Sequence, residues 1–313
     1  MLTLFTAPKP FHGPIDIIQR NAIQSWLKLG PEVEVLLIGD EEGMAKAAAD
    51  FGVRHLKDIR RNKHGTPYVD SVFALARKEA RYPVLCFVNA DMIFLDDFLP
   101  AINRVKDHFE GFLVFGQRWD LDVTERLEFG AQWLQGIRER LRAESQLHGP
   151  LGSDYFVFAR DMFSEMPSFA LGRPGWDNWL IYAGRSAHVP VVDATKAITI
   201  IHQNHDYSHL PGGRPPYGGP ESRENLAAAG GMEVIFMPSD ADWVLTKTEL
   251  APKSWREKDL LRWVESSLIA RFGTSRRSHL VRMIFHPTQA IRYYINAVRR
   301  RVQRVGSDGQ SPD

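Results

Sequence analysis

The sequence predicts an α/β fold with a mostly parallel central sheet and helices on both of its faces. Short apolar runs of strand length alternate with amphipathic segments of helix length through roughly the first 110 residues. Inside these runs polar and apolar residues do not alternate, which is typical of strands buried on both faces, as in parallel sheets. The chain has 313 residues, of which 44% are hydrophobic, and this is enough to bury a large core.

The elements of the front half follow from these patterns. We expect strands at 2–6, 34–38, 53–56 and 83–88, and helices at 15–29, 45–51 and 68–80. In the first helix, Ile15, Ile18, Ala22 and Trp26 recur at helical spacing. Pro8 ends the strand before it, because proline disfavours a continuing regular element.

The second half mixes strands and helices less regularly. We expect strands at 112–115, 155–159, 189–192 and 197–201, and helices at 124–146 and 176–182. A segment rich in Gly, Pro and His at 202–221 predicts a loop. Two terminal helices are expected, at 255–272 and at 278–305, the second interrupted near Pro287, followed by a disordered tail at 306–313.

Charge and cysteine content narrow the class of protein. The formal net charge is +1, from 39 basic and 38 acidic side chains, so no overall field points to a nucleic-acid partner. The single cysteine, Cys86, excludes an intramolecular disulfide and lies in an apolar run, where a buried thiol is expected. No apolar run reaches the roughly 18–20 residues that cross a bilayer, and the N-terminus lacks a basic signal-peptide region. These features predict a cytoplasmic protein.

The C-terminal region is strongly basic. From Arg271 onward it has nine arginines and two acidic residues, with apolar residues such as Leu280 and Ile284 between them. A basic amphipathic helix of this kind either lies on an anionic membrane surface or packs on the main domain or on a partner. Peripheral contact with the inner face of the membrane and the oligomeric state both stay open.

Three polar clusters follow strands of the predicted sheet. They are Thr6 to Lys9, Gly39-Asp40 and Asn89-Ala90-Asp91. In α/β sheets ligands bind beyond the carboxyl ends of the strands, so we expect these clusters to lie close together. Asp91 is the strongest candidate, because a carboxylate directly after a buried strand suits a divalent cation such as Mg²⁺. The alternative for Asp91 is a turn residue or helix cap.

The segment Val88-Asn89-Ala90-Asp91 resembles the Asp-X-Asp motif of GT-A-fold glycosyltransferases, and similarity to the family-2-like members covers roughly 2–205. The resemblance implies a Mn²⁺ or Mg²⁺ ion held by Asp91. It also implies that Asn89 and Ala90 meet the nucleotide, at the ribose or a metal-bound water. Asn89 departs from the family, where many members carry an aspartate.

The resemblance implies further nucleotide contacts. Thr6, Ala7 and Lys9 occupy the family's base-binding edge. Asp40 matches an acidic residue that binds ribose or base, although it is equally a candidate helix N-cap. Asn62 and His64 belong to a basic loop that, in related enzymes, closes over the diphosphate; an exposed basic loop is the alternative.

The resemblance also assigns the acceptor side and a second metal ligand. Asp177 takes the place of the general base of inverting members, with Trp176 positioned to stack on a sugar; an N-cap beside core tryptophans is the other interpretation. Asp154 is a candidate on the acceptor side. His202 or His205 matches a C-terminal histidine that joins the metal, whereas a structural zinc site lacks cysteine partners.

Taken together, these residues predict a metal-dependent glycosyltransferase that moves a sugar from a nucleotide donor, a UDP-sugar, to a hydroxyl of a glycan or lipid-linked acceptor with inversion. The alternatives are a retaining enzyme and a non-catalytic nucleotide- or glycan-binding domain. A nucleotidyltransferase would carry a Gly-rich phosphate loop where Ala7 and Pro8 stand. The predicted domains are a catalytic domain at 1–250, with a nucleotide half at about 1–110 and an acceptor half at about 111–250, and a basic helical extension at 251–305.

Overall fold

The computed structural model describes residues 1–205, 218–254 and 257–288. Packing divides the chain into two compact units, Met1–Ser254 and Trp255–Asp313. All the candidate site residues named above lie in the first unit, and the strands of that unit determine their arrangement.

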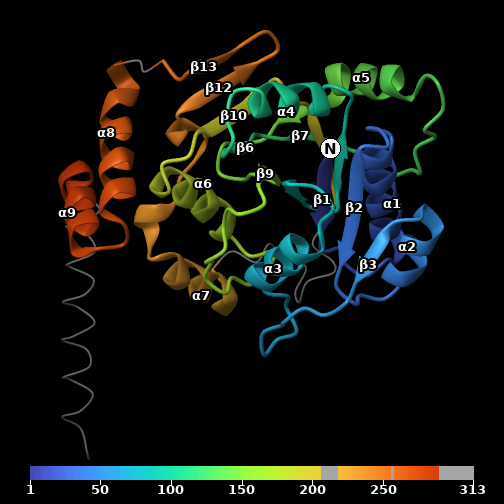
Figure 1. Cartoon of the computed structure of the whole chain (residues 1–313), viewed down its shortest axis with the longest axis horizontal. Helices are drawn as coiled ribbons and strands as arrows, with labels where there is room; N and C mark the ends of the chain where they lie inside the picture. Colours follow the sequence, from blue (N-terminus) through green and yellow to red (C-terminus); the bar gives the residue numbers. More distant parts are fainter. Residues whose placement is uncertain (206–217, 255–256, 289–313) are drawn as a thin grey trace, which may run out of the picture. The chain divides into compact units, whose positions relative to one another are not determined.

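A nine-stranded sheet crosses the described part of the first unit (Figure 1). Its strands lie in the order β13 (Leu250–Pro252), β12 (Trp243–Thr246), β10 (Val191–Lys196), β6 (Leu113–Phe115), β9 (Tyr155–Ala159), β4 (Val84–Val88), β1 (Leu2–Thr6), β2 (Val33–Ile38) and β3 (Arg54–Leu56). β1 pairs in parallel with β2 and β4, and β2 with β3. β9 is antiparallel to β4 and β6, and β13 is antiparallel to β12. The mostly parallel sheet predicted from the sequence is confirmed.

Helices cover both faces of this sheet, because successive side chains of each strand point to opposite faces. One face shares a core with α1 (Gly13–Leu27), α2 (Met44–Phe51) and α4 (Phe98–Lys106), and this core includes the buried Cys86. The other face carries Phe5 and Phe87, whose rings lie 5.1 and 5.5 Å from that of Phe73 in α3 (Val69–Glu79). Phe87 also meets Trp176 of α6 (Trp176–Ser186), at 5.1 Å.

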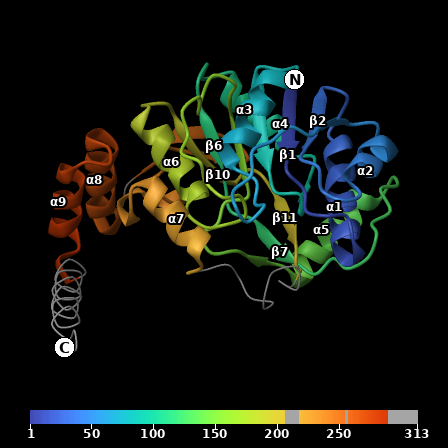
Figure 2. The same ribbon diagram turned by 90° about the horizontal axis from the view of Figure 1, so that it is seen from below.

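A second, smaller sheet provides the link between the two halves of the unit. Its order is β5 (Met92–Phe94), β11 (Ile200–Gln203), β7 (Trp119–Leu121) and β8 (Gln146–Leu147). β11 pairs antiparallel with β5 and parallel with β7, and β7 and β11 run side by side in Figure 2. β5 follows β4 after only three residues, and β11 pairs with β5. The second sheet therefore brings residues around 200 next to the end of β4.

The helix predicted at 124–146 is wrong in its first part, because α5 is Trp133–Glu144. Asn21 of α1 holds the preceding segment in another conformation: its Nδ2 donates to the Glu125 carbonyl at 2.9 Å, and its Oδ1 accepts from the Leu127 N–H at 2.9 Å. Val123 is fully buried beside this segment. Tertiary hydrogen bonds and burial therefore override the helical pattern there.

Other boundaries differ more modestly from the predictions. The strand expected at 189–192 is β10, shifted to Val191–Lys196, and the loop expected at 202–221 begins only after β11 and gives way to α7 (Pro220–Ala229). Residues 206–217 of that loop lie outside the described part. The sequence patterns missed α4, α7 and the short strands β5, β7, β8, β12 and β13. Two short 3₁₀ helices, η2 (Met232–Val234) and η3 (Pro238–Asp240), follow α7.

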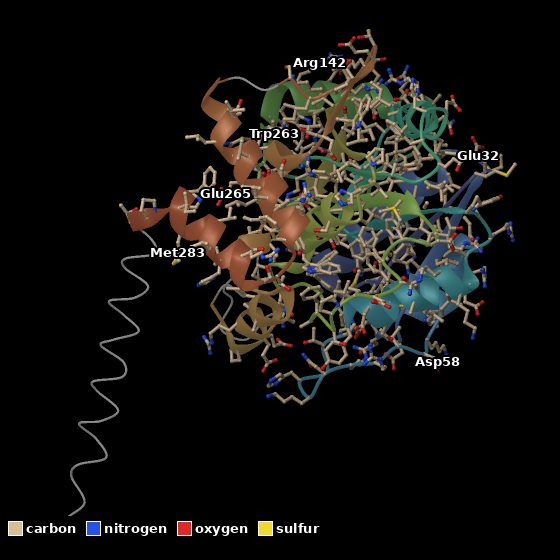
Figure 3. All side chains as sticks on the ribbon, turned by 60° about the vertical axis from the view of Figure 1, so that its left-hand side comes forward. Glu32, Asp58, Arg142, Trp263, Glu265 and Met283 are labelled. Carbon is tan, nitrogen blue, oxygen red and sulfur yellow. The ribbon has the colours of Figure 1, made fainter. Side chains whose placement is uncertain are left out.

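The described part of the second unit consists of α8 (Glu257–Phe272) and α9 (Arg276–Phe285). Figure 3 labels Trp263 and Glu265 on α8 and Met283 on α9. Glu265 receives hydrogen bonds or ion pairs from Arg262 and His286, each at 3.0 Å. The remainder of the helix expected at 278–305, and the tail expected at 306–313, lie beyond the described residues. Among the described helices, none combines the length and apolar character needed to span a bilayer.

Candidate metal and nucleotide site

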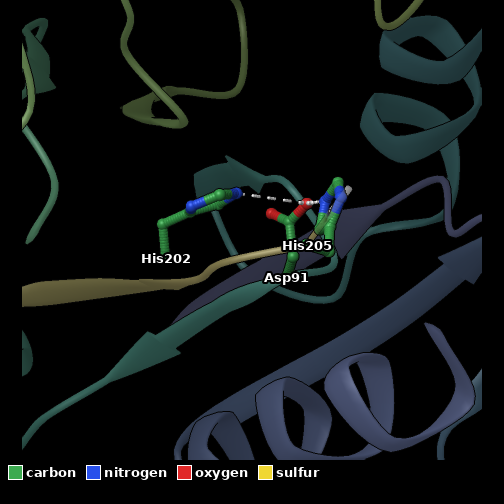
Figure 4. A group of neighbouring side chains, drawn as sticks. All are labelled: Asp91, His202 and His205. Carbon is green, nitrogen blue, oxygen red and sulfur yellow. Dashed lines mark hydrogen bonds and ion pairs between the residues drawn. The ribbon is translucent and has the colours of Figure 1, made fainter. Parts of the chain in front are cut away.

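Three side chains from distant parts of the chain converge at the end of β4 (Figure 4). Asp91 follows β4 in the turn before β5, His202 lies in β11 and His205 lies just beyond it. The pairing of β11 with β5 sets His202 opposite Met92, the residue next to Asp91. One ligand atom from each of the three side chains lies within 4.8 Å of the others. The strand register therefore assembles a possible ligand set for a metal ion.

The side chain of Asp91 is 15% exposed, and neighbouring cations favour the charged form of its carboxyl group. Its Oδ2 lies 3.2 Å from His205 Nε2, 4.0 Å from His202 Nε2 and 3.9 Å from Lys9 Nζ. Burial by itself raises the pKa of Asp91, but the hydrogen bond to His205 and the charges of His202 and Lys9 outweigh it and hold the pKa well below the usual range. The site therefore presents a negative charge in a desolvated position.

The other carboxylate oxygen of Asp91 suggests what completes the site. Asp91 Oδ1 is buried and has no hydrogen-bond partner among the described residues. A buried charged oxygen without a partner is costly unless a cation compensates it. One carboxylate and two imidazoles form a donor set suited to a divalent transition-metal ion such as Mn²⁺. The residues present therefore fit the metal that the sequence predicts.

Gln203 fixes the backbone that carries Asp91. Its side chain is fully buried, and its Nε2 donates to the carbonyls of Asp91 at 3.2 Å and Ile18 at 2.9 Å. Its backbone N–H also donates to the Asp91 carbonyl, at 3.2 Å. Asn21 Nδ2 in turn donates to Gln203 Oε1 at 3.0 Å. This set of hydrogen bonds ties α1, the Asp91 turn and β11 into one rigid support.

A chain of ion pairs extends from the metal ligands toward the end of β9. His202 Nδ1 lies 3.3 Å from Asp120 Oδ1, and Arg118 joins Asp120 to Asp154 through bonds of 2.9 and 2.7 Å. Asn89 closes the chain by donating to Asp154 Oδ1 at 2.7 Å. Burial works against the guanidinium charge, but the two carboxylates outweigh it and raise the pKa of Arg118.

A cleft of about 460 Å³ opens on one side of Asp91. Of the residues predicted to bind the nucleotide, those that line it are Ala7, Lys9, His64, Asn89 and Ala90. Glu41 and Arg173 also line it, and neither was predicted from the sequence. The polar clusters after β1 and β4 do meet at one edge of the sheet, as expected.

The other three predicted nucleotide residues lie outside the lining of this cleft. Thr6 is 1% exposed, and the side chain of Asp40 is 62% exposed and pairs with Arg61. The Asn62 side chain instead shapes its own loop: Oδ1 accepts from the N–H groups of His64 and Thr66, at 2.8 and 3.0 Å. Asn62 Nδ2 donates to Glu221 at 2.6 Å, which ties this loop to α7.

A second cleft, of about 610 Å³, also has Asp91 in its lining. The three residues predicted for the acceptor side, Asp154, Trp176 and Asp177, all line it. Both clefts share a wall that includes Lys9, Asn89, Asp91, Arg173 and His205. Asp91 and His205 thus border both cavities and His202 borders the second, and each cavity can hold a small molecule.

Asp177 and Trp176 differ in their surroundings. Trp176 is 5% exposed and packs its ring against Phe87 and Phe156, so most of its surface belongs to the core. Burial, assisted by the charge of Asp154, raises the pKa of Asp177 from 3.8 to about 6, although backbone N–H groups partly oppose the shift. A carboxyl with such a pKa is able to accept a proton near neutral pH.

Arg118, Asp120, Glu41 and Arg173 are the site residues that sequence analysis missed. Asp120 lies on β7, a three-residue strand with too little apolar pattern to be recognised, and Arg118 directly precedes it. Glu41 directly follows the predicted Asp40. The only signal available for Glu41, Arg118 and Asp120 was their place shortly after predicted strands, which many surface residues share, and Arg173 had no such signal.

No protein-family model matches the chain, and no curated protein matches it. The matching solved structures include glycosyltransferases crystallised with nucleotides and metal ions.

One of them is glucosyl-3-phosphoglycerate synthase from Mycobacterium tuberculosis. Its complex with Mg²⁺ and UDP is 17% identical, over 74% of this chain and 80% of that chain, with a TM-score of 0.43. Its complex with Mn²⁺, UDP and phosphoglyceric acid is also 17% identical, over 82% and 86%, with a TM-score of 0.44. A mannosyltransferase from Pyrobaculum calidifontis, in complex with GDP-Man and Mn²⁺, is 9% identical over 95% and 79%, with a TM-score of 0.46.

Proposed function

We propose that this protein is a metal-dependent glycosyltransferase that transfers a sugar from a nucleotide donor to a hydroxyl group of an acceptor. One observation carries the proposal: Asp91 and His205 lie on the wall shared by two clefts, and His202, which lines the 610 Å³ cleft, completes a possible ligand set with them. A donor nucleotide in one cleft and an acceptor in the other would meet beside these ligands. When bound there by Asp91, His202 and His205, a divalent ion supplies charge neutralisation for the leaving diphosphate.

The chain's own residues would position the donor. In the 460 Å³ cleft, Ala7 and Glu41 belong to the lining that we assign to the base and ribose, and the carboxylate of Glu41 is able to accept hydrogen bonds from ribose hydroxyls. Lys9 and Arg173, which line both clefts, supply cations for the diphosphate. We assign the ribose contact to Glu41 because Asp40 lies outside the cleft lining.

Asp177 is the base that we propose for an inverting reaction. In that reaction the acceptor oxygen forms a bond to the anomeric carbon as the bond from that carbon to the diphosphate oxygen breaks. The proton of the acceptor hydroxyl passes to the Asp177 carboxylate. A raised pKa and a place in the lining of the 610 Å³ cleft both support this role. The retaining alternative needs no base at this position.

The donor and acceptor classes are proposals of finer detail. We propose a UDP-sugar as donor and a glycan or lipid-linked glycan as acceptor. Exposed Leu280 and Ile284 lie on the same side of α9 as exposed Arg277, at spacings of three and four residues. This combination supports peripheral contact with an anionic membrane, where a lipid-linked acceptor would be found.

The test is incubation of the full chain with a panel of nucleotide sugars, with and without Mn²⁺. We expect Mn²⁺-dependent release of the nucleoside diphosphate from at least one donor, and loss of that release in Asp91→Asn. Asp96→Asn is the matched control, because it removes an exposed carboxylate that pairs with Arg138 away from both clefts. Donor binding without turnover for any donor and acceptor would instead favour the non-catalytic binding domain.

A further inference from the structure

We propose that Asp120 is the positioning residue that orients His202, so that its Nε2 lone pair faces Asp91. The consequence for metal binding rests on the proposed function, but the orientation itself concerns only residues of this chain. Asp120 was not a candidate in the sequence, and it lines neither of the two clefts.

The contact between the two residues is set by strand register. β7 and β11 pair in parallel, with His202 directly opposite Asp120. Cross-strand neighbours lie on the same face of a sheet, so their side chains meet. His202 Nδ1 is 3.3 Å from Asp120 Oδ1, and the His202 side chain is only 13% exposed, which limits competition from water.

The chemistry of imidazole gives this contact a consequence. A neutral imidazole carries one N–H and one lone pair, and a carboxylate only accepts hydrogen bonds. The proton of neutral His202 is therefore on Nδ1, and the lone pair is on Nε2. Nε2 is the nitrogen nearer Asp91, 4.0 Å from Oδ2. Metal-binding histidines are commonly held by a carboxylate in this manner.

A second acceptor reinforces the same tautomer. Asn204 Oδ1 also lies 3.3 Å from His202 Nδ1. The orientation of the Asn204 amide is fixed, because its Nδ2 donates to Asp122 Oδ1 at 2.8 Å. Asp120 provides the stronger acceptor of the two, since it carries a charge.

Two further hydrogen bonds hold the Asp120 carboxylate in place, so that it can orient His202. Arg118 Nε donates to Oδ1 at 2.9 Å, and His148 Nδ1 donates to Oδ2 at 2.7 Å. Three donors thus converge on one carboxylate, from the residue before β7, from β11 and from the residue after β8. If Asp120 served only as a partner of Arg118, Asn204 alone would set the tautomer of His202, and removal of the Asp120 carboxylate would leave that tautomer preference unchanged.

The first experiment measures the tautomer of His202 in the metal-free full chain. The protein is labelled with ¹⁵N-histidine and studied at a pH where His202 is neutral; the His202 signals are assigned from their absence in His202→Gln. We expect the Nδ1–H tautomer in the wild type and a smaller fraction of it in Asp120→Ala, where Asn204 is the remaining acceptor. His108 is an internal control, because its Nδ1 lies 2.8 Å from the Arg104 carbonyl, and its signals should not change.

The second experiment measures Mn²⁺ affinity directly, by titration calorimetry without any donor. We expect Asp120→Ala to bind Mn²⁺ about 10–100-fold more weakly than the wild type. Asp120→Asn keeps an acceptor oxygen and should be intermediate. Asp96→Asn removes a carboxylate outside the site and should bind like the wild type.

Two outcomes would overturn the role of Asp120. One is an Nε2–H tautomer in the wild type, which needs no variant to fold. The other is a folded Asp120→Ala or Asp120→Asn protein with the wild-type tautomer and wild-type affinity. A wild type that binds no Mn²⁺ removes the metal from the proposed function, whereas the tautomer still decides whether Asp120 orients His202. Mn²⁺ binding without sugar transfer would count against the proposed function alone.

Discussion

Asn89 donates a hydrogen bond from Nδ2 to Oδ1 of Asp154, at 2.7 Å, and this contact explains why an amide suits position 89. The second oxygen of Asp154 accepts from Arg118 Nη1, also at 2.7 Å. An aspartate at 89 would place an acceptor-only group against a carboxylate. The side chain of Asp154 therefore favours an amide over a carboxylate at position 89.

Asn89→Asp is accordingly expected to be harmful rather than to restore a motif. Two carboxylates at hydrogen-bond distance do not both ionise without a large cost, so we expect the free energy of unfolding at pH 7 to fall by about 2 kcal/mol. Urea denaturation measures this change. Asn89→Ala removes the donor without adding charge and should cost less. Equal stability of Asn89→Asp and the wild type would show that the contact with Asp154 is not maintained in solution.

Asp91→Asn tests the metal centre. The amide has the shape of the carboxylate but no charge, so it binds a divalent ion weakly. Loss of metal-assisted charge stabilisation, of about 4 kcal/mol, predicts a transfer rate about 1,000-fold lower. Steady-state kinetics over a range of Mn²⁺ concentrations measures this. A variant with an unchanged rate and unchanged Mn²⁺ dependence would rule out Asp91 as a ligand.

The pKa of Asp177 predicts how activity and stability depend on pH. A base must be unprotonated, so the transfer rate should fall as the pH drops below about 6. Because burial raises the folded pKa above 3.8, the folded chain binds this proton more tightly than the unfolded chain. The stability contributed by Asp177 is therefore present at low pH and is lost as the pH rises from about 4 to about 6.

Asp177→Asn separates these two effects. It should abolish transfer by an inverting enzyme, and it should remove this part of the decline in the free energy of unfolding between pH 4 and pH 6. Urea denaturation at a series of pH values, compared with the wild type, gives the second measurement. A variant that retains transfer would support the retaining alternative.

Gln203→Leu tests the support beneath Asp91. The change leaves the buried carbonyl of Ile18 and the Nδ2 of Asn21 with fewer partners, which predicts a loss of about 3 kcal/mol in the free energy of unfolding. Chemical denaturation measures the loss. Gln135→Leu, on the exposed side of α5, is a control with the same chemical change and should alter stability little. Similar effects of both substitutions would mean that the Gln203 hydrogen bonds contribute nothing specific.

Glu41 and Asp40 offer a paired test of nucleotide binding. We expect Glu41→Gln to weaken UDP binding by about 10-fold, through the loss of one charged hydrogen bond of about 1.4 kcal/mol to the ribose. Asp40→Asn should change the affinity less than twofold, since its side chain is largely exposed and lines neither cleft. Calorimetric titration with UDP measures both. The reverse ranking would return the ribose contact to Asp40.

The front of the fold could be predicted because its signals are local. Strands such as β1 and β4 are short, wholly apolar runs, and the helices between them show clear spacing of apolar residues. The placement of Asp91 at a strand end followed from the same pattern. β7 and β8, by contrast, have only three and two residues, and their existence depends on pairing with each other and with β11.

The site could be predicted in part for a related reason. Residues at strand ends are brought together by the sheet, which is why Lys9, Asn89 and Asp91 are neighbours as expected. Arg118 and Asp120 owe their place to strand register across segments distant in the sequence, and a single sequence does not contain that information. Asn62 was predicted to contact the nucleotide because it lies in a basic loop. Its side chain instead forms hydrogen bonds within that loop and with Glu221.

The pairing of β5 with β11 has a consequence for the amount of the protein in the cell. Asp91 and His205 are separated by 114 positions, and closing a loop of that length in an unfolded chain costs about 4 kcal/mol of entropy. The unfolded chain therefore has no comparable ligand set, and an ion bound by the folded chain acts as a reversible cross-link. At an ion concentration 100 times the Kd this adds about 2.7 kcal/mol to the free energy of unfolding. Scarcity of the ion would then lower the cellular amount of the protein, through proteolysis of unfolded chains, as well as its catalytic rate.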